Sequence, residues 1–146
     1  MYQKILLATD GSTHALKAAE AARELAALIP GAEVTVLHVL TLTPELTTEL
    51  QHELASDTVT FEEALAGKAQ PVLDRTLAVL REKDIRVRTR FEVGHAAEKI
   101  AETANADGYD LVVIGSRGLG NWQEILLGSV SEKVCHAVHI PILIVK

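Results

Sequence analysis

Five short apolar runs alternate with helical stretches along this chain of 146 residues. The runs are rich in Val, Ile and Leu, and each has the usual length of a β-strand. They are continuous and do not alternate strictly, which is typical of strands that are covered on both faces of a parallel sheet. This order of strands and helices predicts right-handed crossovers and an α/β fold, a doubly wound parallel sheet with helices on both faces. The runs cover about residues 4–9, 33–40, 85–92, 110–115 and 142–145.

Composition restricts the class of protein. The chain is 48% hydrophobic and 23% charged, as in ordinary globular proteins, and its length predicts one domain over residues 1–146. Aromatic residues make up only 3%, the net charge is −6, and no Lys/Arg cluster is dense, so we expect no nucleic-acid partner. No segment approaches a membrane span, and the first residues lead directly into a predicted strand. The lone cysteine, Cys135, fits a reducing compartment, so we expect a cytoplasmic protein in which Cys135 is a small buried residue of the last helix.

Helical signals fill the gaps between the runs. Ser12 can cap a helix that continues to Ile29, and another helix follows Gly94. Two more patterns, at residues 44–54 and 61–80, lie in a region that is longer than one crossover needs. Pro71 lies inside the second of these, and proline costs about 3 kcal/mol or more in a helix interior. A kink or a break is therefore expected between Gly67 and Pro71.

A glycine-rich loop follows the fourth apolar run. It consists of Gly115-Ser116-Arg117-Gly118, nine further residues, and then Gly128-Ser129. Glycines at 115, 118, 120 and 128 allow positive φ and a close approach of the backbone to a ligand. Ser129-Val130-Ser131-Glu132 has the form of a capping box, with Ser129 as the N-cap of a helix. Because a helix N-terminus carries unpaired N–H groups and partial positive charge, this arrangement predicts a site for phosphate.

The spacing Gly-x-x-Gly, nine residues, Gly-Ser resembles the ATP-binding signature of the universal stress protein family. Residues 4–12, 36–39 and 141–146 also resemble the family's opening, second and closing strands, so the resemblance covers nearly the whole chain. It implies a Rossmann-like sheet of five strands in the order 3-2-1-4-5. It also implies ATP as the ligand, with Mg²⁺ held mainly by the phosphates, and a homodimer.

In that strand order the first and fourth strands end side by side, where ligands bind in open α/β sheets. The resemblance then places adenosine between the first turn and Val39, and phosphates along the glycine loop. The residues that match the family's nucleotide contacts are Ala8, Thr9, Asp10, Val39, Ile114, Gly115, Arg117, Gly118, Gly128, Ser129, Val130 and Ser131.

Several of these residues have a second reading. Asp10 fits a turn and helix entry as well as a contact to ribose or metal, and we favour the contact. Ser129 and Ser131 can cap a helix and still contact phosphate. Arg117 can be a surface charge, but its place in the loop favours phosphate. The sequence leaves open whether Trp122 is exposed or covers the site.

No residue is assigned to catalysis or to metal binding. The P-loop lysine is absent, and no base for hydrolysis can be identified. The histidines at 38, 95, 136 and 139 lack the spacing of metal ligands. Three functions stay open: an ATP-binding, nucleotide-responsive regulator, which is the leading hypothesis, a slow ATPase, and a nucleotide-free dimeric interaction module.

The last apolar run, residues 142–145, is the expected dimer contact. In the implied strand order it lies at a sheet edge, where an open apolar strand invites aggregation. Pairing with the same strand of a second copy would cover this edge, and two-fold symmetry makes that pairing antiparallel. The competing interpretation is a monomer in which residues 41–60 cover the edge.

Overall fold

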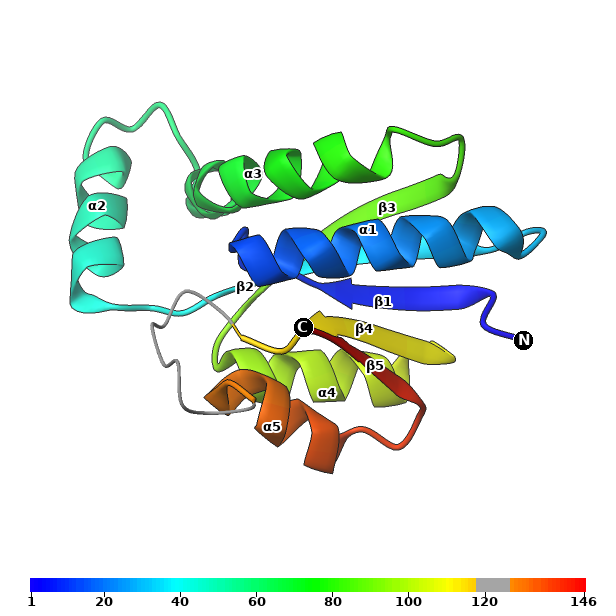
Figure 1. Cartoon of the computed structure of the whole chain (residues 1–146). Helices are drawn as coiled ribbons and strands as arrows, with labels where there is room; N and C mark the ends of the chain where they lie inside the picture. The colour runs from blue at the N-terminus through cyan, green and yellow to red at the C-terminus, as the bar shows by residue number, and fades with distance from the viewer. Residues whose placement is uncertain (118–126) are drawn as a thin grey trace.

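The computed structural model describes residues 1–117 and 127–146 of the chain. Helices and strands alternate through these two ranges (Figure 1). In chain order they are β1 (Lys4–Ala8), α1 (Thr13–Leu28), β2 (Glu33–Leu40), α2 (Pro44–Leu54), α3 (Phe61–Leu80), β3 (Arg86–Val93), α4 (Ala96–Ala106), β4 (Leu111–Gly115), α5 (Ser129–Ala137) and β5 (Ile142–Val145).

Among the described residues the five strands form one parallel sheet in the order β3-β2-β1-β4-β5. β1 lies at its centre, with Ile5 opposite Val34 of β2 on one side and opposite Leu111 of β4 on the other. The α/β class, the parallel sheet and its strand order are therefore confirmed. The strand bounds agree with the apolar runs to within one residue.

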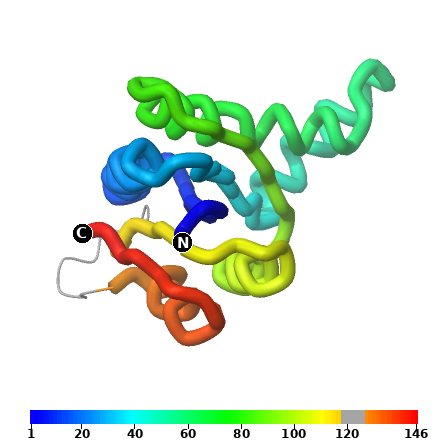
Figure 2. The backbone as a smooth tube through the Cα atoms, turned by 90° about the vertical axis from the view of Figure 1, so that its right-hand side faces the viewer, coloured from blue at the N-terminus to red at the C-terminus, as the bar shows by residue number. Residues whose placement is uncertain are grey.

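The sheet separates two apolar cores. One core lies under α1 and α3, and the other lies under α4 and α5, as the end-on view shows (Figure 2). Strands β1, β2 and β4 contribute to both cores, which explains why their sequences are apolar without alternation. Strand β3, at the edge, is only partly buried, in agreement with its alternating arginines.

Helix α1 lies close to the sheet because its buried face consists of alanines. Its N-cap is Ser12, whose Oγ accepts a hydrogen bond from the backbone N–H of Ala15 at 3.2 Å. The helix ends at Leu28, in agreement with the sequence prediction. Five of its alanines are buried: Ala15, Ala18, Ala19, Ala22 and Ala26.

Gly115 marks the closest approach of β4 to α1. A Cβ at this position would lie 2.8 Å from both the carbonyl carbon and the carbonyl oxygen of His14. Gly115 does not have a positive φ, and neither does Gly128, whose φ is −67°. The expectation of positive φ at these two glycines was wrong. Close packing of backbone on backbone is the reason for glycine at 115, and Gly118 and Gly120 lie outside the described residues.

Helices α2 and α3 correct two other expectations. Helix α3 is continuous from Phe61 to Leu80 with Pro71 inside it, so of the expected kink or break the break does not occur. Helix α2 packs on α3, where the ammonium of Lys68 contacts the carboxylates of Glu49 at 2.8 Å and Glu53 at 2.9 Å, and these contacts raise the pKa of Lys68. In Figure 1 α2 stands beside α3 and away from β5, so residues 41–60 do not cover that edge.

Two further observations concern the surface. Cys135 is exposed on α5, so its interpretation as a buried residue was wrong. The helical signal was correct, but the side of the helix that faces the core had been misjudged: Val134, not Cys135, packs into the core. Within the described ranges, no helix is both long and apolar enough to cross a membrane.

The packing of Gly115 generates a prediction about stability. Replacing Gly115 with alanine forces β4 away from α1, so the free energy of unfolding should fall by about 1–3 kcal/mol. Gly67→Ala is the matched control, because Gly67 is exposed on α3 and a Cβ there meets nothing within 4 Å. It should stabilise the protein by roughly 0.5–1 kcal/mol. Urea unfolding measures both variants, and equal stability of Gly115→Ala and wild type would contradict the packing argument.

Candidate functional site

A cavity of about 640 Å³ opens at the carboxyl ends of β1, β2 and β4. Its volume lies within the range of small-molecule sites. All the sequence-predicted residues that the structure describes line it, whereas Gly118 and Trp122 lie outside the described residues. The lining comprises Ala8, Thr9, Asp10, Ala15, Leu37, His38, Val39, Thr41, Ala96, Ile100, Ile114, Gly115, Arg117, Leu127, Gly128, Ser129, Val130 and Ser131.

One wall of the cavity is apolar. Val39 and Leu37 of β2, Ile114 of β4 and Ile100 of α4 belong to the core cluster on the α4 and α5 face and also line the cavity. Val39 is therefore both core and wall. Sequence reasoning missed Ile100, because its place on the apolar stripe of a helix was assigned to the core alone. Such a wall suits a flat apolar ring.

The turn after β1 forms the opposite, polar side. Asp10 Oδ1 accepts a hydrogen bond from the backbone N–H of Ser12 at 2.9 Å, so this carboxylate orders the turn. The reading of Asp10 as a turn residue is therefore correct. Asp10 Oδ2 accepts no hydrogen bond from the residues that the structure describes, and Asp10 lines the cavity. The turn role and a ligand contact are thus compatible.

His38 contributes a group that the sequence prediction did not assign to the site. Its Nδ1 lies 2.8 Å from the carbonyl oxygen of Thr9. A carbonyl oxygen can only accept, so Nδ1 carries the proton and, in the neutral ring, Nε2 is an acceptor. The hydrogen bond joins the ends of β1 and β2. The only sequence signal was the position of His38 at the end of a strand.

Helix α5 begins at the cavity without a side-chain cap. Its N-cap is Gly128 and not Ser129, so the predicted capping box of Ser129 and Glu132 does not form. Gly128 has no side chain to occupy the first amide groups of the helix, and within the described residues no side-chain cap bond is present. Residues 129–131 line the cavity, and the N-cap residue supplies no side-chain acceptor for their N–H groups.

Hydrogen bonds hold the start of α5 against the end of β4. Ser131 is buried, and its Oγ donates to the carbonyl oxygen of Gly115 at 2.6 Å. The backbone N–H of Gly128 donates to the carbonyl oxygen of Ser116 at 2.6 Å. The N–H of Ser116 in turn donates to Val145 of β5 at 2.7 Å. The hydrogen bonds thus fix the start of α5 to the end of β4, and the end of β4 to β5.

The cavity carries little net charge. Asp10 and Arg117 line it, together with His38, and these are the titratable residues among the described lining. Within the described ranges, no group of three or more His, Cys, Asp or Glu residues could hold a metal ion by itself. The arrangement can bind an apolar ring at one end and an anion at the helix start.

Comparison with known proteins agrees with this architecture. The universal stress protein MJ0531 of Methanocaldococcus jannaschii is 34% identical over the whole chain, which covers 83% of that protein. The solved structure of MJ0577 from the same organism is 32% identical and has a TM-score of 0.79. That match covers 100% of this chain and 96% of the other.

A third comparison concerns a universal stress protein solved in complex with cAMP. It is 26% identical, with a TM-score of 0.64, and the match covers 99% of this chain and 97% of that one. The sequence profile of the universal stress protein family matches residues 1–146. The chain therefore belongs to the universal stress protein family.

Proposed function

We propose that the cavity binds an adenine nucleotide, and that this nucleotide is ATP with Mg²⁺ held mainly by its phosphates. We also propose that the protein is a cytoplasmic, nucleotide-responsive regulator. One observation carries the proposal: an apolar wall and an uncapped helix N-terminus meet in one cavity of about 640 Å³. The wall suits adenine, and the amide groups suit phosphate. The complex of a related family member with cAMP supports an adenine nucleotide as the ligand class.

The proposed ligand spans the cavity from β2 to α5. Adenosine lies between Val39 and the turn at residues 8–10, where Asp10 can accept a hydrogen bond from a ribose hydroxyl. The phosphates follow Gly115 and Arg117 to the amide groups at residues 128–131. Arg117 gives this path its charged donor. Hydrolysis is not part of the proposal, because no base is identified that could activate water.

The test of this function is equilibrium binding of ATP, ADP, AMP and cAMP, measured by calorimetry on wild type and on Gly128→Asp. An aspartate at the N-cap bonds to the amide groups that the phosphates need and adds negative charge, so ATP affinity should fall at least tenfold, or about 1.4 kcal/mol. The helix itself should gain a few tenths of a kcal/mol in stability.

Gly128→Ala is the matched control, because the φ of −67° at this position accepts alanine and the amide groups stay free of a cap. It should bind ATP more tightly than Gly128→Asp does. Equal binding by wild type and Gly128→Asp would place the phosphates elsewhere. Absence of binding by wild type to every nucleotide would contradict the proposed function.

Charge predicts a dependence on metal. ATP carries about four negative charges at neutral pH, whereas Arg117 and the helix start supply about one and a half positive charges, which Asp10 partly offsets. Addition of EDTA should therefore weaken ATP binding about tenfold or more, since Mg²⁺ no longer offsets phosphate charge. AMP binding should change less than twofold. Titration of both nucleotides with and without Mg²⁺ measures this, and equal loss for AMP would point to a metal held by the protein.

We also propose a homodimer through β5. Leu143 is 39% exposed, and the strand pairs with β4 on its inner side. Wild type should sediment as a dimer at micromolar concentration, and Leu143→Lys should sediment as a monomer, because it places charge in the apolar contact. Leu28→Lys, on a residue that is 80% exposed at the end of α1, should stay dimeric. A monomeric wild type would contradict this contact.

A further inference from the structure

A buried chain of hydroxyl groups joins α3 to the turn after β1. Thr9 Oγ1 lies 2.9 Å from Thr76 Oγ1, although 67 positions separate the two residues in the sequence. Thr76 is fully buried and Thr9 is 6% exposed. The backbone N–H of Gly11 donates to Thr9 Oγ1 at 3.2 Å, and Thr76 Oγ1 donates to the carbonyl oxygen of Val72 at 3.1 Å.

The direction of every bond in this chain follows from proton counting. Each hydroxyl has one proton, and Thr76 uses its proton on Val72, because a carbonyl oxygen can only accept. Thr9 must therefore donate to Thr76. Thr9 Oγ1 is then free to accept from the N–H of Gly11. Thr76 is thus the hydrogen-bond partner that holds the Thr9 hydroxyl from α3.

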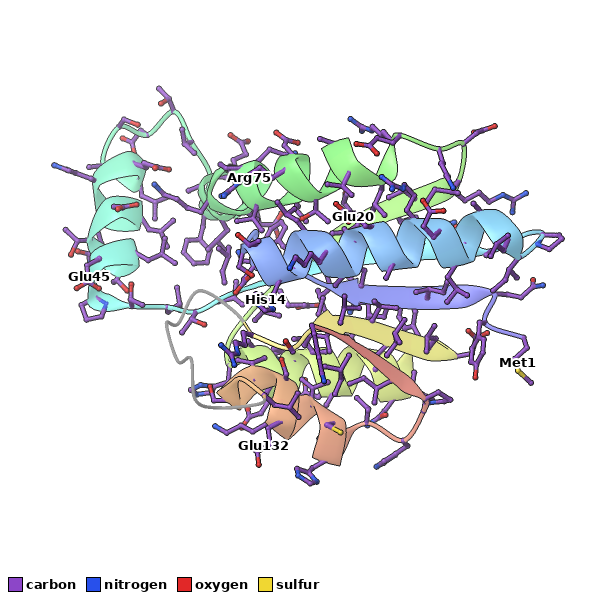
Figure 3. The ribbon with its side chains drawn as sticks, viewed as in Figure 1. Met1, His14, Glu20, Glu45, Arg75 and Glu132 are labelled. Atoms are coloured by element: carbon purple, nitrogen blue, oxygen red, sulfur yellow. The ribbon has the colours of Figure 1, made fainter. Side chains whose placement is uncertain are left out.

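Helix α3 also packs against the turn from outside. The guanidinium of Arg75 lies over Gly11, since a Cβ built on that glycine would be 3.3 Å from Arg75 Cζ. Figure 3 shows Arg75 on α3 above the first turn of α1, where His14 is labelled. Gly11 has a φ of +77°, a conformation that glycine adopts readily and other residues rarely adopt. The turn is thus held from α3 by one hydrogen bond and one packing contact.

We propose that Thr76 is a positioning residue for the nucleotide site and acts through Thr9. By holding the Thr9 hydroxyl it holds the N–H of Gly11, and so the Asp10 carboxylate between them, which lines the cavity. Thr76 itself is absent from the cavity lining. The inference deepens the proposed function and rests on it for the ligand, but the effect on the turn is independent of any ligand.

The alternative is that Thr76 is only a buried helix residue that bonds to its own backbone. Under that alternative, loss of its hydroxyl would lower stability and leave the turn and the binding affinity as they are. Under the proposal, loss of the hydroxyl leaves the Thr9 proton without an acceptor, so Thr9 turns away and releases Gly11. The two therefore differ in what happens at the amide of Gly11.

The experiment compares Thr76→Val and Thr76→Ser with Thr103→Val, a buried threonine of α4 that does not line the cavity. In the ligand-free protein, amide exchange of Gly11 should be about tenfold faster in Thr76→Val and close to wild type in the other two. ATP affinity should fall about tenfold in Thr76→Val and less than twofold in Thr76→Ser and Thr103→Val. If Thr76→Val does not fold, Thr76→Ala takes its place, because it removes the hydroxyl without adding bulk.

A double-mutant cycle tests whether Thr76 acts through Thr9. The double variant Thr9→Val/Thr76→Val should bind ATP no more weakly than Thr9→Val alone. The reason is that Thr9→Val by itself already breaks the hydrogen-bonded chain. Additive losses, or unchanged Gly11 exchange in a folded Thr76→Val, would overturn the inference. If wild type binds no nucleotide, the proposed function fails, yet faster Gly11 exchange in Thr76→Val would still support the positioning role.

Discussion

The central place of β1 in a parallel sheet is the constraint on which the rest of the structure depends. Its neighbours β2 and β4 are reached by crossovers on opposite faces, so the chain leaves the sheet in two directions at adjacent strand ends. A crevice must form there, because no helix can fill the space between diverging connections. The cavity and all the candidate site residues of the described chain lie at this place.

The helix N-termini of the described chain fall into two groups, with and without a side-chain cap. In helices α1, α2 and α3 the side chain of the N-cap residue accepts a hydrogen bond from a backbone N–H of the first turn. These N-caps are Ser12, Thr43 and Thr60. Helices α4 and α5 begin without such a bond, and Ala96 and Ser129, their first residues, line the cavity. Their amide groups are available to a bound anion, which is consistent with the proposed nucleotide site.

Much of the fold could be predicted because the relevant signals are local. Apolar runs identified the strands, and Ser12 marked a helix start, while the order of strands came from family resemblance. Two of the errors share a cause, because each concerned which neighbour a residue meets. A turn with positive φ was predicted at Gly115, but the glycine is there because the backbone of His14 packs against it. Cys135 was assigned to the core, but α5 turns it to solvent.

The sequence by itself determined the α/β class and the glycine loop, because hydrophobic periodicity and motif spacing act over short distances along the chain. The candidate residues of the site came from the family resemblance. Only the tertiary structure decided that Gly128 is the helix cap, that His38 and Ile100 join the site, and that Thr76 contacts Thr9. These contacts link elements far apart in the chain. Packing of helices on a sheet creates them, and no local pattern encodes which side chains meet across that interface.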